Sequence, residues 1–270
     1  MTQFFEEKKN NYLNFKSLFV PQFHGTVKDS NLIIIEFING KTLRYLKGIE
    51  LDYKDVITMI YELLTIVRDL HVKKYIIRDL RETNLMIDIN KNLVMIDFDR
   101  VETEEYIRNY DEVTRDICSD FSAPEVCESG EFSYSGDVFS LGKVIQYIID
   151  NSNIKFEDKN KKEIMFEIIN DCTKIEPEKR PSISIVYQKF FQSFVEDITL
   201  PFVSVTDDSF FVDMYSLVQG SDEKCRQLSI NFFIEGAKRN NKDAQFMLAE
   251  IYEEGKYVQR NVDMAIHYYS

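Results

Sequence analysis

The segment from Asp55 to His71 constrains the fold more than any other part of the sequence. Its apolar residues recur at helical spacing, which predicts a helix buried in a protein core. At 270 residues, of which 44% are hydrophobic, the chain is long enough to surround such a helix with other elements. The apolar positions are Val56, Ile57, Met59, Ile60, Leu63, Leu64, Val67 and Leu70.

Short β-rich runs precede this helix, and mainly helical patterns follow it. Gln22 to Val27 and Asn31 to Phe37 are expected to pair as a hairpin, and an amphipathic helix is expected at Phe4 to Phe19. This order predicts an α+β fold rather than alternating β and α units. The elements expected after the buried helix are strands at Leu85–Ile89 and Leu93–Ile96, a loop at Glu102–Ser122, and helices at Val138–Ile149, Lys161–Cys172 and Ser182–Val195.

Charge and apolar runs narrow the possible partners. The net charge is -13 and no basic stripe is present, so we expect neither nucleic acid nor a membrane as a partner. The purely apolar runs are only four or five residues long, and the first twenty residues do not resemble a secretory signal. Four widely spaced cysteines lack metal-ligand spacing, so we expect reduced thiols in a cytoplasmic protein.

Five motifs occur in a fixed order between roughly residues 5 and 195, and together they resemble the protein kinase family. Ile77 to Asn84 (I-R-D-L-R-E-T-N) resembles the catalytic loop, and Asp97-Phe98-Asp99 resembles the metal-binding motif. Ala123-Pro124-Glu125 matches the A-P-E motif of that family. The other two motifs are Asp137 to Gly142, similar to the start of the central helix, and Arg180-Pro181-Ser182, whose arginine is expected to form a buried ion pair with Glu125.

The resemblance implies ATP- and Mg²⁺-dependent transfer of a phosphoryl group to a protein hydroxyl. Asp79 would accept the proton of the attacking hydroxyl, and Arg81 would neutralise the transferred phosphate. Asn84 and Asp97 would hold Mg²⁺, which prefers hard oxygen ligands. Arg78, which precedes Asp79, would form an ion pair with a phosphate group on the loop between residues 102 and 122.

The same resemblance assigns the adenine-binding segment to the strand before Asn39. Ile35 would guard the adenine pocket, while backbone groups of Glu36 and Ile38 would meet the edge of the base. The sequence Ile33 to Phe37 is also simply a good β-strand, so a structural role is an alternative.

Several departures from the family pattern bear on activity. No glycine precedes Gly25, so the Gly-rich loop and the lysine-bearing strand are absent from these residues. Ile77 replaces the histidine of the catalytic loop, and Asp99 replaces the glycine of the metal-binding motif. Cys118 stands where a serine/threonine kinase carries a substrate-positioning threonine. Two readings follow: a serine/threonine-type protein kinase, or a catalytically impaired pseudokinase scaffold; a small-molecule kinase of related fold is a third.

The end of the chain resembles Sel-one-like repeats, which are related to tetratricopeptide repeats and bind proteins. The resemblance rests on a pattern of Ala, Leu, Tyr and Gly from Ala237 to Tyr269, and on residues 36 positions apart, such as Phe232 and Tyr268. An ordinary helical hairpin is the alternative.

The expected domains are therefore a kinase-like domain, a linker and a repeat segment. The kinase-like domain covers 1–197, with a partial small lobe at 1–38 and a large lobe at 39–197. The linker covers 198–212, and incomplete all-α repeats cover 213–270. We expect the sequence to be the middle of a longer polypeptide.

Overall fold

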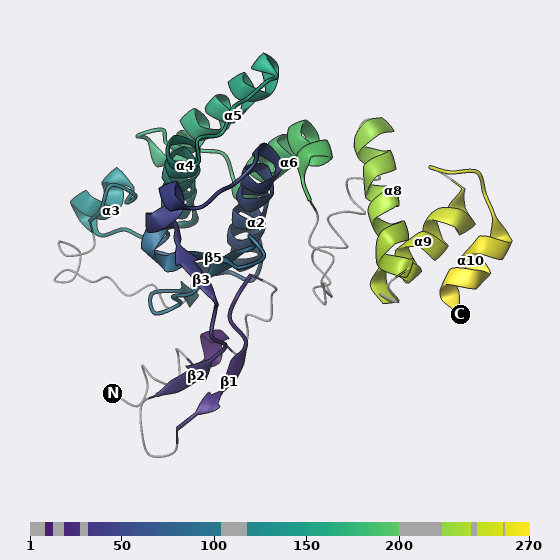
Figure 1. Cartoon of the computed structure of the whole chain (residues 1–270), viewed down its shortest axis with the longest axis horizontal. Coiled ribbons are helices and arrows are strands. Elements are labelled where there is room, and N and C mark those ends of the chain that lie inside the picture. The colour runs from purple at the N-terminus through teal and green to yellow at the C-terminus, as the bar shows by residue number, and fades with distance from the viewer. Residues whose placement is uncertain are drawn as a thin grey trace. The chain divides into compact units, whose positions relative to one another are not determined.

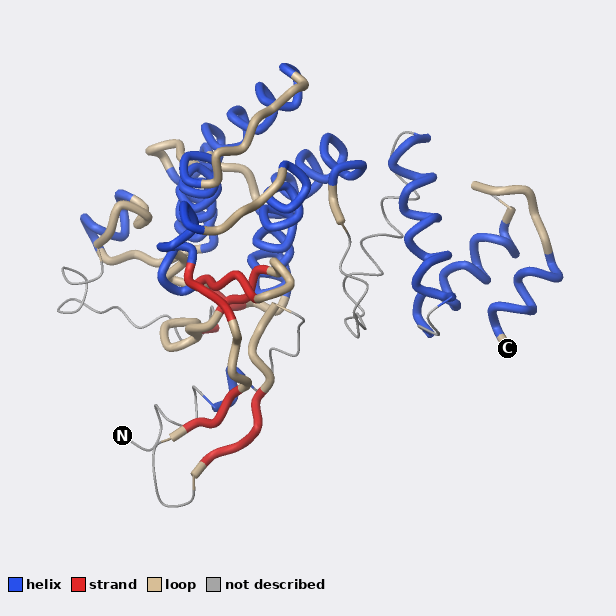
Figure 2. The backbone as a smooth tube through the Cα atoms, viewed as in Figure 1, coloured by secondary structure: helices blue, strands red, loops and turns tan. Residues whose placement is uncertain are grey.

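The computed structural model describes residues 9–12, 19–27, 32–103, 118–199, 223–238, 242–255 and 257–270. The chain divides into two compact units, residues 1–200 and 201–270. The first contains both strands and helices, whereas the described part of the second is helical (Figures 1 and 2).

Helix α2 (Tyr53–Val72) forms the core of the first unit, as the sequence predicts. It begins with a reciprocal capping box, in which Asp52 accepts a hydrogen bond from the Asp55 amide at 2.8 Å and Asp55 accepts one from the Asp52 amide at 2.9 Å. Helices α4 (Tyr134–Asn151) and α6 (Ile183–Phe194) pack against α2, and α5 (Lys159–Cys172) packs against both of them. All three helices expected in this region are confirmed.

Two antiparallel strand pairs are also confirmed. Strand β1 (Phe23–Thr26) pairs with β2 (Ile33–Ile35), and β5 (Leu85–Asp88) pairs with β6 (Leu93–Met95). The β1–β2 ribbon projects from the rest of the unit in Figure 1. The helix expected at Phe4–Phe19 is seen at residues 9–12, whereas Phe19 lies in a turn, so the helix ends before it; residues 4–8 and 13–18 lie outside the described part of the chain.

The sequence does not reveal the third strand of the sheet that contains β5. Strand β3 (Gly40–Thr42) pairs with β5, where Asn39-Gly40 suggests only a break in the pattern. A Cβ atom on Gly40 would lie 2.1 Å from the backbone oxygen of Ile87, so the glycine allows a close approach of two strands. Such an approach depends on the tertiary fold and leaves no local signal.

Short elements complete the frame of the first unit. Strand β4 (Tyr75–Ile76) pairs with β7 (Glu102–Thr103), which begins the stretch expected to be a loop. The others are the 3₁₀ helices η1 (Leu43–Gly48), η2 (Glu82–Asn84), η5 (Pro177–Lys179) and η6 (Val195–Asp197), and helix α3 (Pro124–Ser129).

The second unit contains helices α8 (Glu223–Lys238), α9 (Lys242–Glu254) and α10 (Val262–Tyr269). Helix α9 packs against both of its neighbours, and the rings of Tyr252 and Tyr268 stack with centroids 6.0 Å apart. No helix in the described residues of either unit is long and apolar enough to cross a lipid bilayer.

Candidate active site

Asp137 of helix α4 fixes the backbone of the loop that carries Asp79. Its carboxylate accepts hydrogen bonds from the amides of Ile77 and Arg78 at 2.7 and 2.9 Å, and it lies 2.9 Å from the ring nitrogen Nε2 of His71. Arg78 has a φ of 68°, a conformation that residues other than glycine rarely adopt. A buried carboxylate with several partners thus holds the loop in an unusual backbone shape.

Asn84 joins the two ends of this loop. Its amide nitrogen Nδ2 donates to the backbone oxygen of Asp79 at 2.9 Å and to the Asp79 carboxylate oxygen Oδ2 at 3.0 Å. Helix η2 ends at Asn84, and the asparagine is 6% exposed, so these contacts are held in a shielded position. The structure therefore brings together Asp79 and Asn84, two residues that the family resemblance assigns to the site.

Two arginines face the Asp79 carboxylate. Nε of Arg81 lies 3.1 Å from Asp79 Oδ1, and Nε of Arg100 lies 3.8 Å from Asp79 Oδ2. The sequence analysis identifies Arg81 but misses Arg100, which directly follows the Asp97-Phe98-Asp99 motif. No local pattern distinguishes Arg100 from a surface arginine, because its contact with Asp79 spans 21 residues of chain.

The Asp97-Phe98-Asp99 motif forms a tight turn beside Asn84. Asp97 Oδ1 accepts a hydrogen bond from the Asp99 amide at 2.9 Å, and the Ile96 amide donates to the Asn84 backbone oxygen at 3.0 Å. Because Ile96 directly precedes Asp97, this second bond places the Asp97 backbone close to Asn84. Phe98 is fully buried, which anchors the turn in the core.

Residues 9–12 pack against this turn. The ring of Tyr12 lies edge-on to Phe98 with centroids 5.3 Å apart, and Asn11 Nδ2 donates to the Val101 backbone oxygen at 2.9 Å. Burial, together with the charges of Asp97 and Asp99, raises the pKa of Tyr12 to about 12. The Tyr12 hydroxyl therefore stays protonated and donates to the Ile96 backbone oxygen at 3.3 Å.

The donor set at this position fits Mg²⁺. Asp97 and Asn84 supply carboxylate and amide oxygens, and Mg²⁺ usually takes one or two such ligands and completes its shell with phosphate oxygens and water. Within the described residues, no group of three or more His, Cys, Asp or Glu side chains could hold a metal on its own.

The three residues expected at the adenine lie on β2 and the segment that follows it. Ile35 and Ile38 are half-buried, and Glu36 is exposed. The Glu36 amide donates to the Gln22 backbone oxygen at 2.8 Å, and the Glu36 carboxylate accepts from the Gln22 amide at 3.1 Å. These bonds join the segments that flank the β1–β2 pair and give the Glu36 segment a defined shape.

The predicted ion pair between Glu125 and Arg180 is confirmed. The guanidinium donates to both Glu125 oxygens, at 2.6 and 2.9 Å, and the arginine side chain is fully buried. It also donates to the backbone oxygens of Lys174, Ile175 and Ser135, at 2.7, 2.8 and 3.1 Å. All of its donor groups are used, so this pair fixes the position of α3 on the helical part of the unit.

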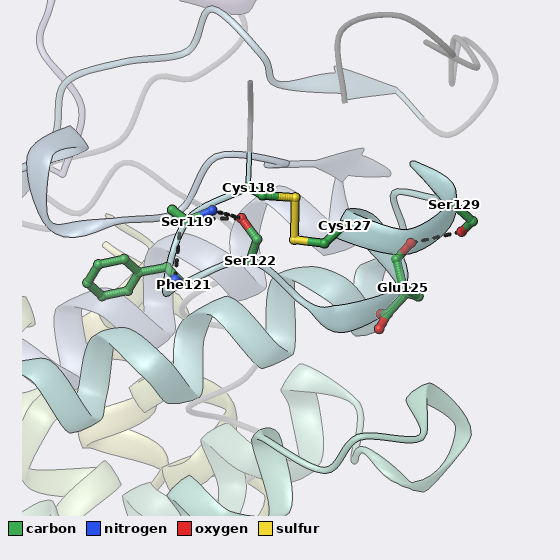
Figure 3. Close-up of a disulfide and its surroundings, with 7 residues drawn as sticks. All are labelled: Cys118, Ser119, Phe121, Ser122, Glu125, Cys127 and Ser129. Carbon is green, nitrogen blue, oxygen red and sulfur yellow. Dashed lines mark hydrogen bonds between the residues drawn. A yellow bond between two sulfur atoms is a disulfide. The ribbon is translucent and has the colours of Figure 1, made fainter. Parts of the chain in front are cut away.

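The expectation of reduced thiols is wrong for Cys118 and Cys127, which form a disulfide across nine residues (Figure 3). Their Cα atoms are 5.5 Å apart, a separation that suits this bond. A turn at Ser119–Ser122 reverses the chain and brings the two cysteines together, and their spacing alone does not reveal it. Cys172 is a free thiol and is buried, as expected for a structural cysteine.

Comparisons with known proteins agree with this geometry. The profile of the protein kinase domain family matches residues 7–201. The match covers most of the chain and contains all five motifs. The chain therefore belongs to the protein kinase family.

Its similar relatives are protein kinases of several named specificities. A dual specificity protein kinase of Dictyostelium discoideum is 26% identical over 193 residues, which cover 66% of this chain and 30% of that protein. A probable serine/threonine-protein kinase of the same organism is 27% identical over 209 residues, covering 66% and 34%. A tyrosine-protein kinase of Girardia tigrina is 24% identical over 198 residues, covering 62% and 40%. The chain thus spans about a third of the length of the first two relatives.

Proposed function

We propose that this chain carries the phosphoryl-transfer centre of an ATP- and Mg²⁺-dependent protein kinase that acts on serine or threonine hydroxyls. The observation that carries the proposal is the position of Asn84, whose side chain contacts Asp79 while its backbone oxygen accepts from Ile96, beside Asp97. One asparagine thus gathers the proposed base and the proposed metal ligand. Phosphoryl transfer depends mainly on such positioning and on charge neutralisation.

The proposed roles follow from the contacts. A substrate hydroxyl attacks the γ-phosphorus, Asp79 accepts its proton, and the bond between the γ-phosphorus and the bridging oxygen breaks to release ADP. Bound Mg²⁺ would neutralise charge on the phosphates, held by Asp97 and the Asn84 side-chain oxygen. Arg81 and Arg100 lie where they can pair with a phosphate once it displaces them from Asp79.

Serine/threonine specificity is proposed from the position of Arg81, where serine/threonine-type kinases usually carry a lysine; a guanidinium can also neutralise the transferred phosphate, with different geometry. The named specificities of the relatives differ, so specificity needs a direct test. Peptide libraries that contain serine, threonine or tyrosine as the only hydroxyl residue supply it. Transfer to tyrosine alone would overturn this part of the proposal.

The activity itself is tested by transfer of labelled phosphate to a mixed protein substrate. Asp79→Asn should lower the rate by about 10²- to 10⁴-fold, because a positioned base is lost. The matched control is Asp150→Asn, an exposed aspartate near the end of α4, which should leave the rate unchanged. Equal rates for the wild type and Asp79→Asn would contradict the assigned role.

A pseudokinase scaffold is the second candidate. It is favoured by the lack, in these residues, of a Gly-rich loop and a strand lysine that would cover and pair with the phosphates. In that case ATP would bind weakly and only with Mg²⁺. A thermal-shift titration separates the readings, since a dissociation constant in the low micromolar range or below would contradict the scaffold.

We also propose that helices α8 to α10 belong to a Sel-one-like repeat segment that binds partner proteins, following a linker at 198–212. Support comes from the packing of α9 against both α8 and α10 and from the stacked rings of Tyr252 and Tyr268. The test compares the binding of a partner protein fragment to the whole chain and to a variant that carries both Tyr252→Ala and Tyr268→Ala. Loss of binding in the variant supports this role, provided that circular dichroism shows unchanged helical content.

A further inference from the structure

The two exposed cysteines near the A-P-E motif differ in setting from the buried cysteine of the first unit. Cys118 and Cys127 are both exposed, whereas Cys172 is fully buried on α5. Burial raises the pKa of the Cys172 thiol to about 12, so it stays protonated. Small oxidants and reductants can reach the exposed pair but not Cys172.

The turn between the two cysteines is held by its own hydrogen bonds. The Ser119 amide donates to Ser122 Oγ at 3.1 Å, the Phe121 amide donates to Ser119 Oγ at 3.2 Å, and the Ser122 amide donates to the Ser119 backbone oxygen at 3.0 Å. Figure 3 shows these bonds beside the disulfide. These hydrogen bonds do not involve the sulfur atoms, so they do not depend on the sulfur–sulfur bond for their donors or acceptors.

The Cys127 end of the bonded segment is anchored in the core, and in the turn the ring of Phe121 lies edge-on to Tyr147 of α4 with centroids 5.8 Å apart. Ala123 and Val126 are buried in a small cluster with Ile76 and Phe132, and Glu125 is paired with Arg180. Cys127 is thus attached to a fixed helix, α3, although its own side chain faces solvent. The disulfide ties Cys118, at the start of the turn, to that fixed point.

We propose that Cys118 and Cys127 are a reversible oxidation site, whose closure holds residues 118–122 against helix α3. Its effect on substrate binding rests on the proposed function, because Cys118 stands where the family resemblance places a substrate-positioning threonine. The thiol chemistry and its structural effect stand apart from that function. A reversible bond also suits a compartment in which thiols are kept reduced.

The chemistry needs a peroxide as oxidant and a dithiol as reductant. One cysteine thiolate attacks a peroxide oxygen and forms a sulfenic acid, and the second thiolate attacks that sulfur and closes the bond. Two thiols and one hydrogen peroxide thus give one disulfide and two water molecules. Reduction proceeds by thiol–disulfide exchange, in which the dithiol supplies two electrons and becomes a disulfide.

The first test measures the thiols directly, with hydrogen peroxide and dithiothreitol as probes and Cys225→Ser as the background. Both cysteines fall in one tryptic peptide, residues 116–143, and cleavage after Glu125 separates them. We expect the folded, reduced protein to take two maleimide labels here, the peroxide-treated protein to take none, and the two fragments to remain linked in the latter. Cys172 should stay unlabelled throughout, which shows that the protein remains folded.

Two results would overturn the proposal. One is full labelling of Cys118 and Cys127 after peroxide treatment. The other is a bond that dithiothreitol opens only under conditions that also expose Cys172, because such a bond would be structural rather than reversible.

The second test measures the structural effect. Closing a short loop should raise the unfolding temperature of the first unit by roughly 5 °C and slow hydrogen exchange at residues 118–122. Cys127→Ser and Cys118→Ser should abolish both differences between oxidised and reduced protein, and Cys172→Ala should preserve them. Equal hydrogen exchange in the two redox forms would contradict the proposal that the disulfide holds residues 118–122 against α3, whatever the rate of phosphate transfer. Loss of phosphate transfer in both redox forms would count against the proposed function alone.

Discussion

Two arginine–carboxylate pairs in the first unit differ in almost every physical respect. Arg180 is fully buried and forms a bidentate ion pair with Glu125, and its remaining N–H groups donate to backbone oxygens. Arg81 is 38% exposed and meets Asp79 through Nε at 3.1 Å, in a cluster where Arg100 also approaches. The first pair fixes a helix in place, whereas the second leaves its charges available to a ligand. The comparison separates residues that hold the fold from residues that can do chemistry.

The largest expected effect is that of breaking the buried pair. Arg180→Met should lower the free energy of unfolding by about 4 kcal/mol, because it leaves the Glu125 carboxylate and three backbone oxygens without their donor. Urea unfolding followed by circular dichroism measures the change. The neighbouring Lys179→Met is the control, since its pair with Glu176 is exposed and its loss should not be measurable. Equal effects of the two variants would mean that the buried pair stabilises the fold no more than the exposed pair does.

A buried carboxylate on α2 sharpens the comparison, because no arginine among the described residues forms an ion pair with it. Glu62 is fully buried and accepts a hydrogen bond from the Leu93 amide at 2.7 Å. Burial raises its pKa to about 8, so the native protein holds a proton that the unfolded chain releases above about pH 4.5. Stability contributed by this proton is present at low pH and is lost as pH rises toward 8.

Glu62→Gln should therefore flatten the pH dependence of stability. Relative to the wild type, the variant should gain roughly 3 kcal/mol between pH 5 and pH 8, measured by urea unfolding at each pH. Glu163→Gln, an exposed residue on α5, is the control and should follow the wild type. A Glu62→Gln curve parallel to the wild type would mean that Glu62 ionises normally in the core.

Asp137 should have an intermediate effect. Asp137→Asn turns one acceptor into a donor that faces a backbone amide of Ile77 or Arg78, which should cost about 2 kcal/mol. It should also speed hydrogen exchange at those two amides. Unchanged exchange there would show that the loop keeps its shape without this carboxylate.

Asp79 should have the smallest effect on stability. Asp79→Asn should change the free energy of unfolding by less than about 1 kcal/mol, since its arginine partners are 38% and 36% exposed and an asparagine keeps one acceptor oxygen for them. If Asp79→Asn lowered the free energy of unfolding as much as Arg180→Met, Asp79 would be a residue that stabilises the fold.

The sequence predicts the frame of the first unit better than its details. Helix α2 and the three later helices follow from apolar periodicity, and Glu125 and Arg180 follow from motifs whose side chains have structural partners. Strand β3, the contact of Arg100 with Asp79, and the Cys118–Cys127 bond arise only when distant or turning chain segments meet. The assigned roles of Asp79, Arg81, Asn84 and Asp97, and of Ile35, Glu36 and Ile38, remain predictions.

The dependence of the catalytic-loop backbone on Asp137 has a consequence for biosynthesis. The carboxylate that holds Ile77 and Arg78 is encoded about 60 residues downstream of them. At translation rates of 5–20 residues per second, the ribosome needs roughly 3 to 12 s to add that stretch. During this interval the nascent loop lacks the partner that favours a φ of 68° at Arg78. A nascent chain stalled before α4 should therefore carry Asp79 in a loop that has not yet taken its final shape.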